Sequence, residues 1–154
     1  MALPIPKKNK AVPFLFAGSF ASGKQRTTRS RTRVRGTVEA GFPSPAEEEL
    51  VDTLSLDELL IQNREASFLL RVTGDSMTGA GIMPKDLVIV DRGRTAKSGD
   101  IVIAEVDGEW TMKYLRKRGE NVTLVAANPR YQPIRPKHEL KIAGVVTAVV
   151  RKYT

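Results

Sequence analysis

The sequence predicts a mainly β protein: a small antiparallel sheet or barrel-like domain with short helices and a flexible N-terminal arm. Three observations lead to this fold class. From residue 67 onward, short segments rich in Val, Ile, Leu and Thr are separated by turn residues. Asp107-Gly108 is the pair preferred in a type I′ turn between two strands. The first 40 residues show no sustained hydrophobic period of about 2 or 3.6, as expected of a flexible segment.

The length and composition indicate one folded domain. The chain has 154 residues, of which 41% are hydrophobic and 27% charged, so a core of modest size is expected. We place the boundary at Gly41, with an arm over 1–40 and a folded domain over 41–154. The outline of a signal peptide at the start is interrupted by Pro13, Gly18 and Ser19, which makes secretion the less favoured interpretation. No apolar stretch approaches the roughly 20 residues that span a bilayer, so a soluble cytoplasmic protein with no membrane contact is expected.

The positive charge is concentrated in the arm. Nine of the 25 Lys and Arg residues and one of the 17 acidic residues lie within 1–40, which leaves 16 of each in 41–154. The arm therefore carries the whole formal charge of +8. Direct DNA binding by this arm is one interpretation, and a solvated tail is the other, simpler one.

Two helix starts are predicted before the β-rich region. Ser44, Pro45 and Glu47 have the spacing of a capping box, in which the serine accepts from the first amides of the helix. Ser55 and Glu58 repeat the pattern, in a stretch long enough for a single helical turn. Both predicted helices are short.

Five segments are predicted to contain strands, and they cover 67–74, 86–91, 99–119, 121–128 and 140–153. The third contains the hairpin turn at Asp107-Gly108. In the strand after this turn, alternation places one set of residues on each face. One face carries Thr111, Lys113 and Leu115, and the other carries Trp110, Met112 and Tyr114. Lys113 thus shares a face with an apolar residue.

Catalysis, if present, must use a restricted set of side chains. The chain has no cysteine and a single histidine, His138, which excludes thiol nucleophiles, disulfides and His-rich metal sites. His138 lies in the polar stretch RPKHEL, which is typical of an exposed loop. No metal or other cofactor is expected.

Ser76, in the glycine-rich stretch RVTGDSMTGAG, is either a turn or helix-capping residue or a nucleophile. A serine nucleophile needs a base, and a neutral lysine can take this role. An unperturbed lysine has a pKa of about 10.4, so only about one in 2,500 is neutral at pH 7, but burial lowers that pKa. Lys113 is the candidate base if it is buried, whereas a lysine at a sheet edge would extend into water. Residue chemistry alone leaves both alternatives open.

The segment FLLRVTGDSMTGAGIMPKDLVIVDRGRTAKSGDIVIAEVDGEWTMKYL resembles the Ser-Lys autopeptidase domain of LexA-type repressors and UmuD-type mutagenesis proteins, the peptidase S24 family. The similarity continues through NPRYQPI and IAGVV and covers roughly 41–154. It implies an autopeptidase domain in which Ser76 is the nucleophile and Lys113 the general base. It also implies self-cleavage between Ala40 and Gly41 in VEAGFPSP, because family members cut between a small residue and glycine upstream of the domain.

The resemblance further implies a role and partners. An arm of 40 residues containing Pro4, Pro6 and Pro13 is too short for a helix-turn-helix domain, which favours the UmuD-type branch over a repressor. Members of that branch are homodimers that cleave themselves on a RecA filament formed on single-stranded DNA, as part of the SOS response. The product then serves a UmuC-type error-prone DNA polymerase. The alternatives are a LexA-like repressor fragment, a DNA-binding module acting through its arm, and a signal-peptidase-like enzyme, which would need a membrane anchor.

Overall fold

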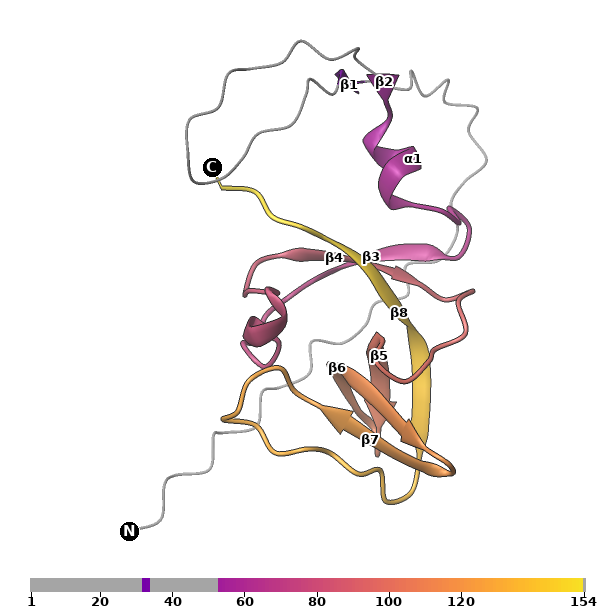
Figure 1. Cartoon of the computed structure of the whole chain (residues 1–154), viewed down its shortest axis with the longest axis vertical. Helices are drawn as coiled ribbons and strands as arrows, with labels where there is room; N and C mark the ends of the chain where they lie inside the picture. The colour runs from indigo at the N-terminus through magenta and orange to yellow at the C-terminus, as the bar shows by residue number, and fades with distance from the viewer. Residues whose placement is uncertain (1–31, 34–52, 154) are drawn as a thin grey trace.

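The computed structural model describes residues 32–33 and 53–153. The predicted helix that begins near Ser44, most of the predicted arm and the Ala40–Gly41 bond lie outside the described residues. Within the described part, one six-stranded antiparallel sheet dominates (Figure 1). The prediction of a mainly β fold with little helix is confirmed.

The sheet has the strand order β3-β4-β8-β5-β6-β7. Its strands are β3 (Ser67–Arg71), β4 (Leu87–Asp91), β5 (Ile101–Val106), β6 (Glu109–Arg118), β7 (Asn121–Val125) and β8 (Leu140–Val150). Every neighbouring pair is antiparallel, and each of the five predicted segments contains at least one of these strands. Separately, β1 (Thr32–Arg33), in the predicted arm, pairs with β2 (Thr53–Leu54).

The long strand β8 joins the two parts of the sheet. Its first half pairs with β5 and its second half with β4, as the yellow strand in Figure 1 shows. The register shifts once against each partner, and such bulges bend a strand. Between the two shifts lies Gly144, where a Cβ atom would come within 2.7 Å of Val90 and 2.8 Å of the Asp91 carbonyl oxygen. Only glycine allows this close approach of β8 to β4.

The turn between β5 and β6 has the predicted type I′ conformation. Asp107 and Gly108 have φ angles of 49° and 86°, and Val106 pairs with Glu109 across the turn. Both central residues of a type I′ turn need a positive φ, which Asp and Gly tolerate better than most residues. The Asp107 carboxylate also accepts from the backbone N–H groups of Lys137, His138 and Glu139, which fixes the chain entering β8.

Buried side chains form two clusters that follow the alternation of the strands. The first contains Val72, Met77, Ile82, Val88, Val90 and Ile103. The second contains Val102, Ala104, Val106, Leu115, Leu124 and Val145. On β6, Met112 and Tyr114 pack against the first cluster and Leu115 belongs to the second, as the predicted period of two requires.

The short helix predicted after Ser55 is present as α1 (Leu56–Leu60). The capping hydrogen bond expected from the serine side chain is absent. Ser55 is the N-cap residue, but its side chain makes no capping hydrogen bond. Ser55 is 4% exposed, and its carbonyl oxygen accepts from Leu59 N–H at 3.0 Å, so the single turn closes through the backbone. The prediction was right about the helix and wrong about the side chain that starts it.

An ion pair between the buried carboxylate of Asp86 and the solvent-accessible Arg151 connects the end of β8 to the turns just before β4. Arg151 donates to both carboxylate oxygens of Asp86, at 2.7 and 2.6 Å, and to the Gly81 carbonyl oxygen at 2.6 Å. The Asp86 carboxylate also accepts from Met83 N–H at 2.7 Å. These bonds, first of all that from Arg151, lower the pKa of Asp86 to about 2. The carboxylate is therefore ionised in the folded protein down to strongly acidic pH.

We expect Arg151→Ala to lower the midpoint temperature of unfolding by several degrees at pH 7, because it leaves the Asp86 carboxylate buried without its cation. An unfolded aspartate has a pKa of about 3.9, so the stabilisation is present above that pH and is lost as the pH falls toward 2. Thermal unfolding followed by circular dichroism at pH 7, 4 and 2.5 measures this trend. The control is Arg64→Ala, which breaks the exposed pair with Asp57 and should change little. Equal effects of the two variants would contradict the prediction.

Candidate functional site

Ser76 lies in a tight turn between β3 and the short 3-10 helix η1 (Thr78–Ala80). The turn is closed at the Asp75 carbonyl oxygen, which accepts from Thr78 N–H at 3.3 Å and from the Thr78 hydroxyl at 3.1 Å. Met77, 1% exposed, anchors the turn in the first core cluster. The N-cap of η1 is Met77 and not Ser76, so the helix-capping interpretation of the serine is wrong.

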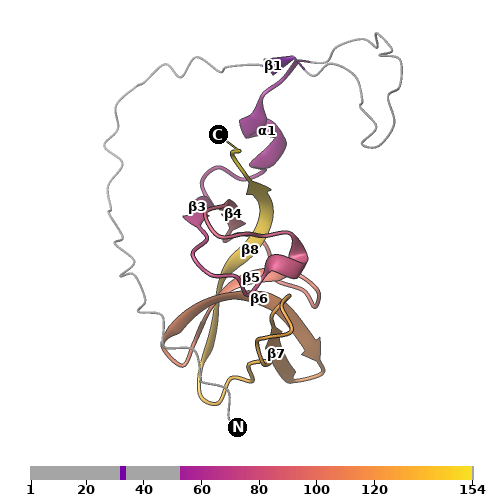
Figure 2. The ribbon, with the colours of Figure 1, turned by 90° about the vertical axis from the view of Figure 1, so that its left-hand side faces the viewer.

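The turn brings Ser76 to Lys113 of β6. In both views the segment that carries η1 extends from β3 and β4 toward β6 (Figure 1, Figure 2). Lys113 Nζ lies 2.8 Å from Ser76 Oγ, although 37 positions separate the two residues along the chain. The side chain of Lys113 does not extend into water, since the residue is 5% exposed. The structure thus brings together the two residues that the sequence singled out.

Burial of Lys113 changes its acid-base chemistry. Desolvation lowers the pKa of its amine to about 8, because the charged form loses its contact with water. An ion pair with an acidic side chain would stabilise the charged form and raise the pKa again. None of the described acidic side chains forms an ion pair with Lys113. At pKa 8, about one lysine in ten is neutral at pH 7, instead of about one in 2,500 for an unperturbed lysine.

The contacts of Nζ fit a neutral amine that acts as a base. Nζ lies 2.9 Å from Thr111 Oγ1 and 2.9 Å from the Met112 carbonyl oxygen, in addition to its contact with Ser76. A neutral amine has two N–H bonds and one lone pair. Two of the three contacts are acceptors that can take the two N–H bonds, which leaves the lone pair for the Ser76 hydroxyl proton. The same three contacts accept the three protons of the ammonium form after transfer.

The surroundings of Ser76 leave room for a substrate segment. A Cβ atom at Gly74 would meet no atom within 4 Å, so the chain just before the serine borders open space. Within the described structure, the Ser76 backbone N–H has no hydrogen-bond partner. A free N–H next to a nucleophile is a donor for the negative oxygen that forms on an attacked carbonyl.

Three residues around Ser76 were not identified as functional from the sequence. Asn128 donates from Nδ2 to the Asp75 carbonyl oxygen at 3.0 Å, and Arg130 and Tyr131 donate to the Asp75 carboxylate. The Tyr131 hydroxyl first and Arg130 second lower the pKa of Asp75. The stretch NPRYQPI is part of the family resemblance, but its polar and proline-rich composition indicates only a loop. Its contact with the serine turn is a property of the tertiary structure.

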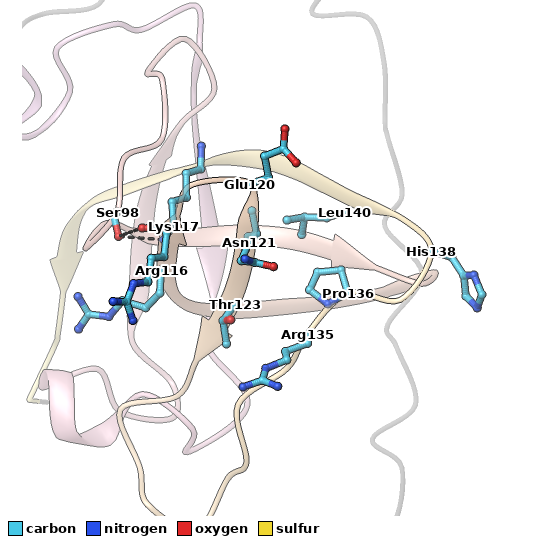
Figure 3. Close-up of a pocket in the computed structure, with 12 residues that line it drawn as sticks. Ser98, Arg116, Lys117, Glu120, Asn121, Thr123, Arg135, Pro136, His138 and Leu140 are labelled. Carbon is cyan, nitrogen blue, oxygen red and sulfur yellow. Dashed lines mark hydrogen bonds between the residues drawn. The ribbon is translucent and has the colours of Figure 1, made fainter.

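His138 lies away from the two candidate residues, as the sequence indicated. It is exposed and borders a groove on the β6–β7 hairpin, together with basic side chains that include Arg116, Lys117 and Arg135 (Figure 3). Neither Ser76 nor Lys113 lines this groove. The described residues contain no cluster of His, Cys, Asp or Glu that could hold a metal ion. The described part also contains no helix long and apolar enough to cross a membrane.

Comparison with known proteins gives one family and two groups of relatives. The model of the family described as Peptidase S24-like matches residues 33–147. Protein SamA of Salmonella typhimurium is 43% identical over 73% of this chain and 79% of its own length, and protein ImpA of the same species is 41% identical over 74% and 79%. The LexA repressor of Anaeromyxobacter dehalogenans is 41% identical over 77% of this chain. This chain spans about half of that repressor, since the match covers 54% of its length.

Proposed function

Because this chain belongs to the peptidase S24-like family, as its motifs predicted, we propose that it is a self-cleaving serine endopeptidase with Ser76 as nucleophile and Lys113 as general base. The observation that carries the proposal is the 2.8 Å contact between Lys113 Nζ and Ser76 Oγ at a lysine that is 5% exposed. Burial raises the fraction of neutral amine, and at 2.8 Å this amine is within reach of the hydroxyl proton.

The proposed reaction is an acyl transfer in two steps. Neutral Lys113 takes the Ser76 proton as Oγ attacks the Ala40 carbonyl carbon, and the Ser76 N–H donates to the oxygen that becomes negative. When the Ala40–Gly41 bond breaks, the Lys113 ammonium returns its proton to the departing Gly41 amine. Lys113 then takes a proton from the water that attacks the Ala40 ester on Ser76 and returns a proton to Ser76 Oγ as the ester bond breaks, which releases the Ala40 carboxyl group and restores the free serine and the neutral lysine.

The proposed substrate is the chain itself, cut between Ala40 and Gly41. The bond lies outside the described residues, and the support for it is the sequence VEAGFPSP and the family resemblance. A tethered substrate is present at a high effective concentration, so no external substrate is required. Cleavage separates the arm, 1–40, with its formal charge of +8, from a domain over 41–154 that is formally neutral.

We further propose that the cleaved form is a UmuD-type accessory subunit of an error-prone, UmuC-type DNA polymerase that acts in translesion synthesis. On this proposal the protein is a cytoplasmic homodimer, and a RecA filament on single-stranded DNA promotes cleavage by favouring the state in which the arm occupies the site. The support is the motif resemblance together with the identity to SamA and ImpA. DNA binding by the basic arm is a separate, secondary role that cleavage would remove.

The test is to identify the bond that is cut. Purified protein is incubated at pH 9, with and without RecA, ATP and single-stranded DNA, and fragment masses and N-terminal sequences are determined. We expect one new N-terminus at Gly41, absent from a Ser76→Ala sample treated in parallel. A parent chain that stays intact in both conditions would contradict the proposed self-cleavage. A higher cleavage rate with RecA, ATP and single-stranded DNA than without them would support the proposed regulation.

A further inference from the structure

The residue before the nucleophile is held from a second part of the chain. Asp75 is bonded at its backbone by Asn128 and at its side chain by Arg130 and Tyr131. These three residues belong to the segment Asn128–Tyr131, which follows β7. The sequence places this segment more than 50 positions away from the Ser76 turn, so the contact connects two separate parts of the fold.

The amide of Asn128 is fixed in one orientation. The residue is 7% exposed, and its Oδ1 accepts from Arg130 N–H at 3.1 Å. Because the oxygen is engaged on that side, the Nδ2 group faces the Asp75 carbonyl oxygen at 3.0 Å. Next to it, the Ala127 carbonyl oxygen accepts from Gly79 N–H at 2.7 Å, and a Cβ atom at Gly79 would lie 2.1 Å from that oxygen. The turn and the segment therefore meet at backbone distance.

The direction of the Asp75 carbonyl determines the direction of the next N–H. The described part of the chain contains no cis peptide bond, and the C=O and N–H of a planar trans peptide point in opposite directions. Asn128 holds the Asp75 carbonyl oxygen toward the segment Asn128–Tyr131. The Ser76 N–H consequently points away from that segment, where it has no partner among the described residues.

We propose that Asn128 is a positioning residue, which keeps the Ser76 N–H aimed at the carbonyl oxygen of the bond under attack. The inference rests on the proposed function, in which that N–H stabilises the negative oxygen. Asn128 makes no described hydrogen bond to Ser76 or Lys113, so it acts through the orientation of the Asp75–Ser76 peptide and not through proton transfer.

The turn itself does not depend on Asn128. Thr78 closes it locally, through both its N–H and its hydroxyl at the same Asp75 carbonyl oxygen. Loss of the Asn128 bond should therefore leave the turn formed, and still attached through Gly79 and the Asp75 carboxylate, but with the orientation of the Asp75–Ser76 peptide less well fixed. Misplacement of a reacting group by about 1 Å is enough to reduce a rate by about 100-fold, so a smaller rotation should give a loss of about 30-fold.

The experiment measures the rate of self-cleavage in the full-length chain from pH 6 to 10, with RecA, ATP and single-stranded DNA if cleavage needs them. For Asn128→Ala we expect the rate on the alkaline plateau to fall by about 30-fold, while the pH midpoint stays at that of the parent. The pKa of Lys113, followed by the 13C shift of its Cε, should also stay unchanged. The matched control is Gln132→Ala, an exposed residue just beyond the same segment, for which the parent rate is expected.

A second variant separates positioning from folding. Asn128→Asp keeps the size of the side chain and the acceptor for Arg130 N–H but lacks the Nδ2 donor. It should retain the folded structure by circular dichroism and lose at least as much plateau rate as Asn128→Ala. Plateau rates at the parent level in both variants would overturn the inference, as would a loss that disappears entirely at high pH, because Asn128 would then act through Lys113. A parent chain that never cuts itself would instead overturn the proposed function.

Discussion

Replacing Lys113 with methionine will lower the rate of self-cleavage by at least about 10⁴-fold, the size of effect that follows loss of the base or nucleophile in serine peptidases. Methionine has a similar length and fits an apolar environment, but it has no lone pair that can take the Ser76 proton. Ser76→Ala should have an effect of the same size. The double variant should be no slower than either single one, because the two groups act in one step.

Lys117→Met is the matched control, since Lys117 lies four positions further on the same strand, is exposed and does not contact Ser76. Rates come from quantification of the intact chain and fragments at pH 9. Cleavage by the Lys113→Met variant at more than a hundredth of the parent rate would show that another group serves as the base.

Thermal unfolding of Lys113→Met tests whether its loss of activity reflects a loss of fold. The pKa of Lys113 is about 8 in the folded protein and about 10.4 in an unfolded chain, so the unfolded chain binds more protons between these values. The lysine therefore destabilises the folded state most below pH 8, and this effect fades as the pH rises toward 10.4. Lys113→Met should be at least as stable as the parent at pH 7, and its advantage should shrink by pH 10.

The rate of self-cleavage in the parent should rise about 90-fold between pH 6 and pH 9. Only the neutral form of Lys113 can act as the base, and its fraction follows a pKa of about 8. The rate should increase about tenfold per pH unit below pH 7 and become constant above about pH 9. A lysine with the ordinary pKa of about 10.4 would instead give a rate that is still rising tenfold per unit at pH 9.

The measurement is a series of single-turnover rates across this range, in buffers of equal ionic strength, with circular dichroism at each pH to confirm that the fold is retained. A rate that is constant from pH 6 to 9, or that falls with rising pH, would contradict a role for neutral Lys113. The profile of Asn128→Ala should have the same midpoint and a lower plateau, which would distinguish the proposed base, Lys113, from the proposed positioning residue, Asn128.

Local sequence features predicted most of the sheet. Alternation placed Lys113 and Leu115 on one face of β6, and Asp107-Gly108 specified the turn before it, because strand periodicity and turn conformation depend on neighbouring residues. The same local reasoning was wrong about the Ser55 capping bond, where burial and backbone closure replaced the expected contact.

The bulges of β8 and the close approach at Gly144 were not predicted. They depend on which strands lie next to β8, and its partners β4 and β5 come from parts of the chain far from it in sequence. A glycine in a strand either destabilises the strand or marks a place where another part of the chain approaches its backbone closely, and the sequence alone does not distinguish the two. The strand order β3-β4-β8-β5-β6-β7, which places β8 beside β4, shows that Gly144 marks a close contact.

The sequence by itself determined the types of residue available for chemistry and the motifs that identify the family. The absence of cysteine excluded a thiol nucleophile, the single histidine in a polar stretch made lysine the favoured candidate for a base, and the ordered motifs pointed to Ser76 and Lys113. Only the tertiary structure decided that these residues meet at 2.8 Å, that Lys113 is buried with a pKa of about 8, and that Asn128 holds the peptide before Ser76. The physical reason is that desolvation and hydrogen-bond geometry depend on all the surrounding atoms, which strands distant in sequence supply.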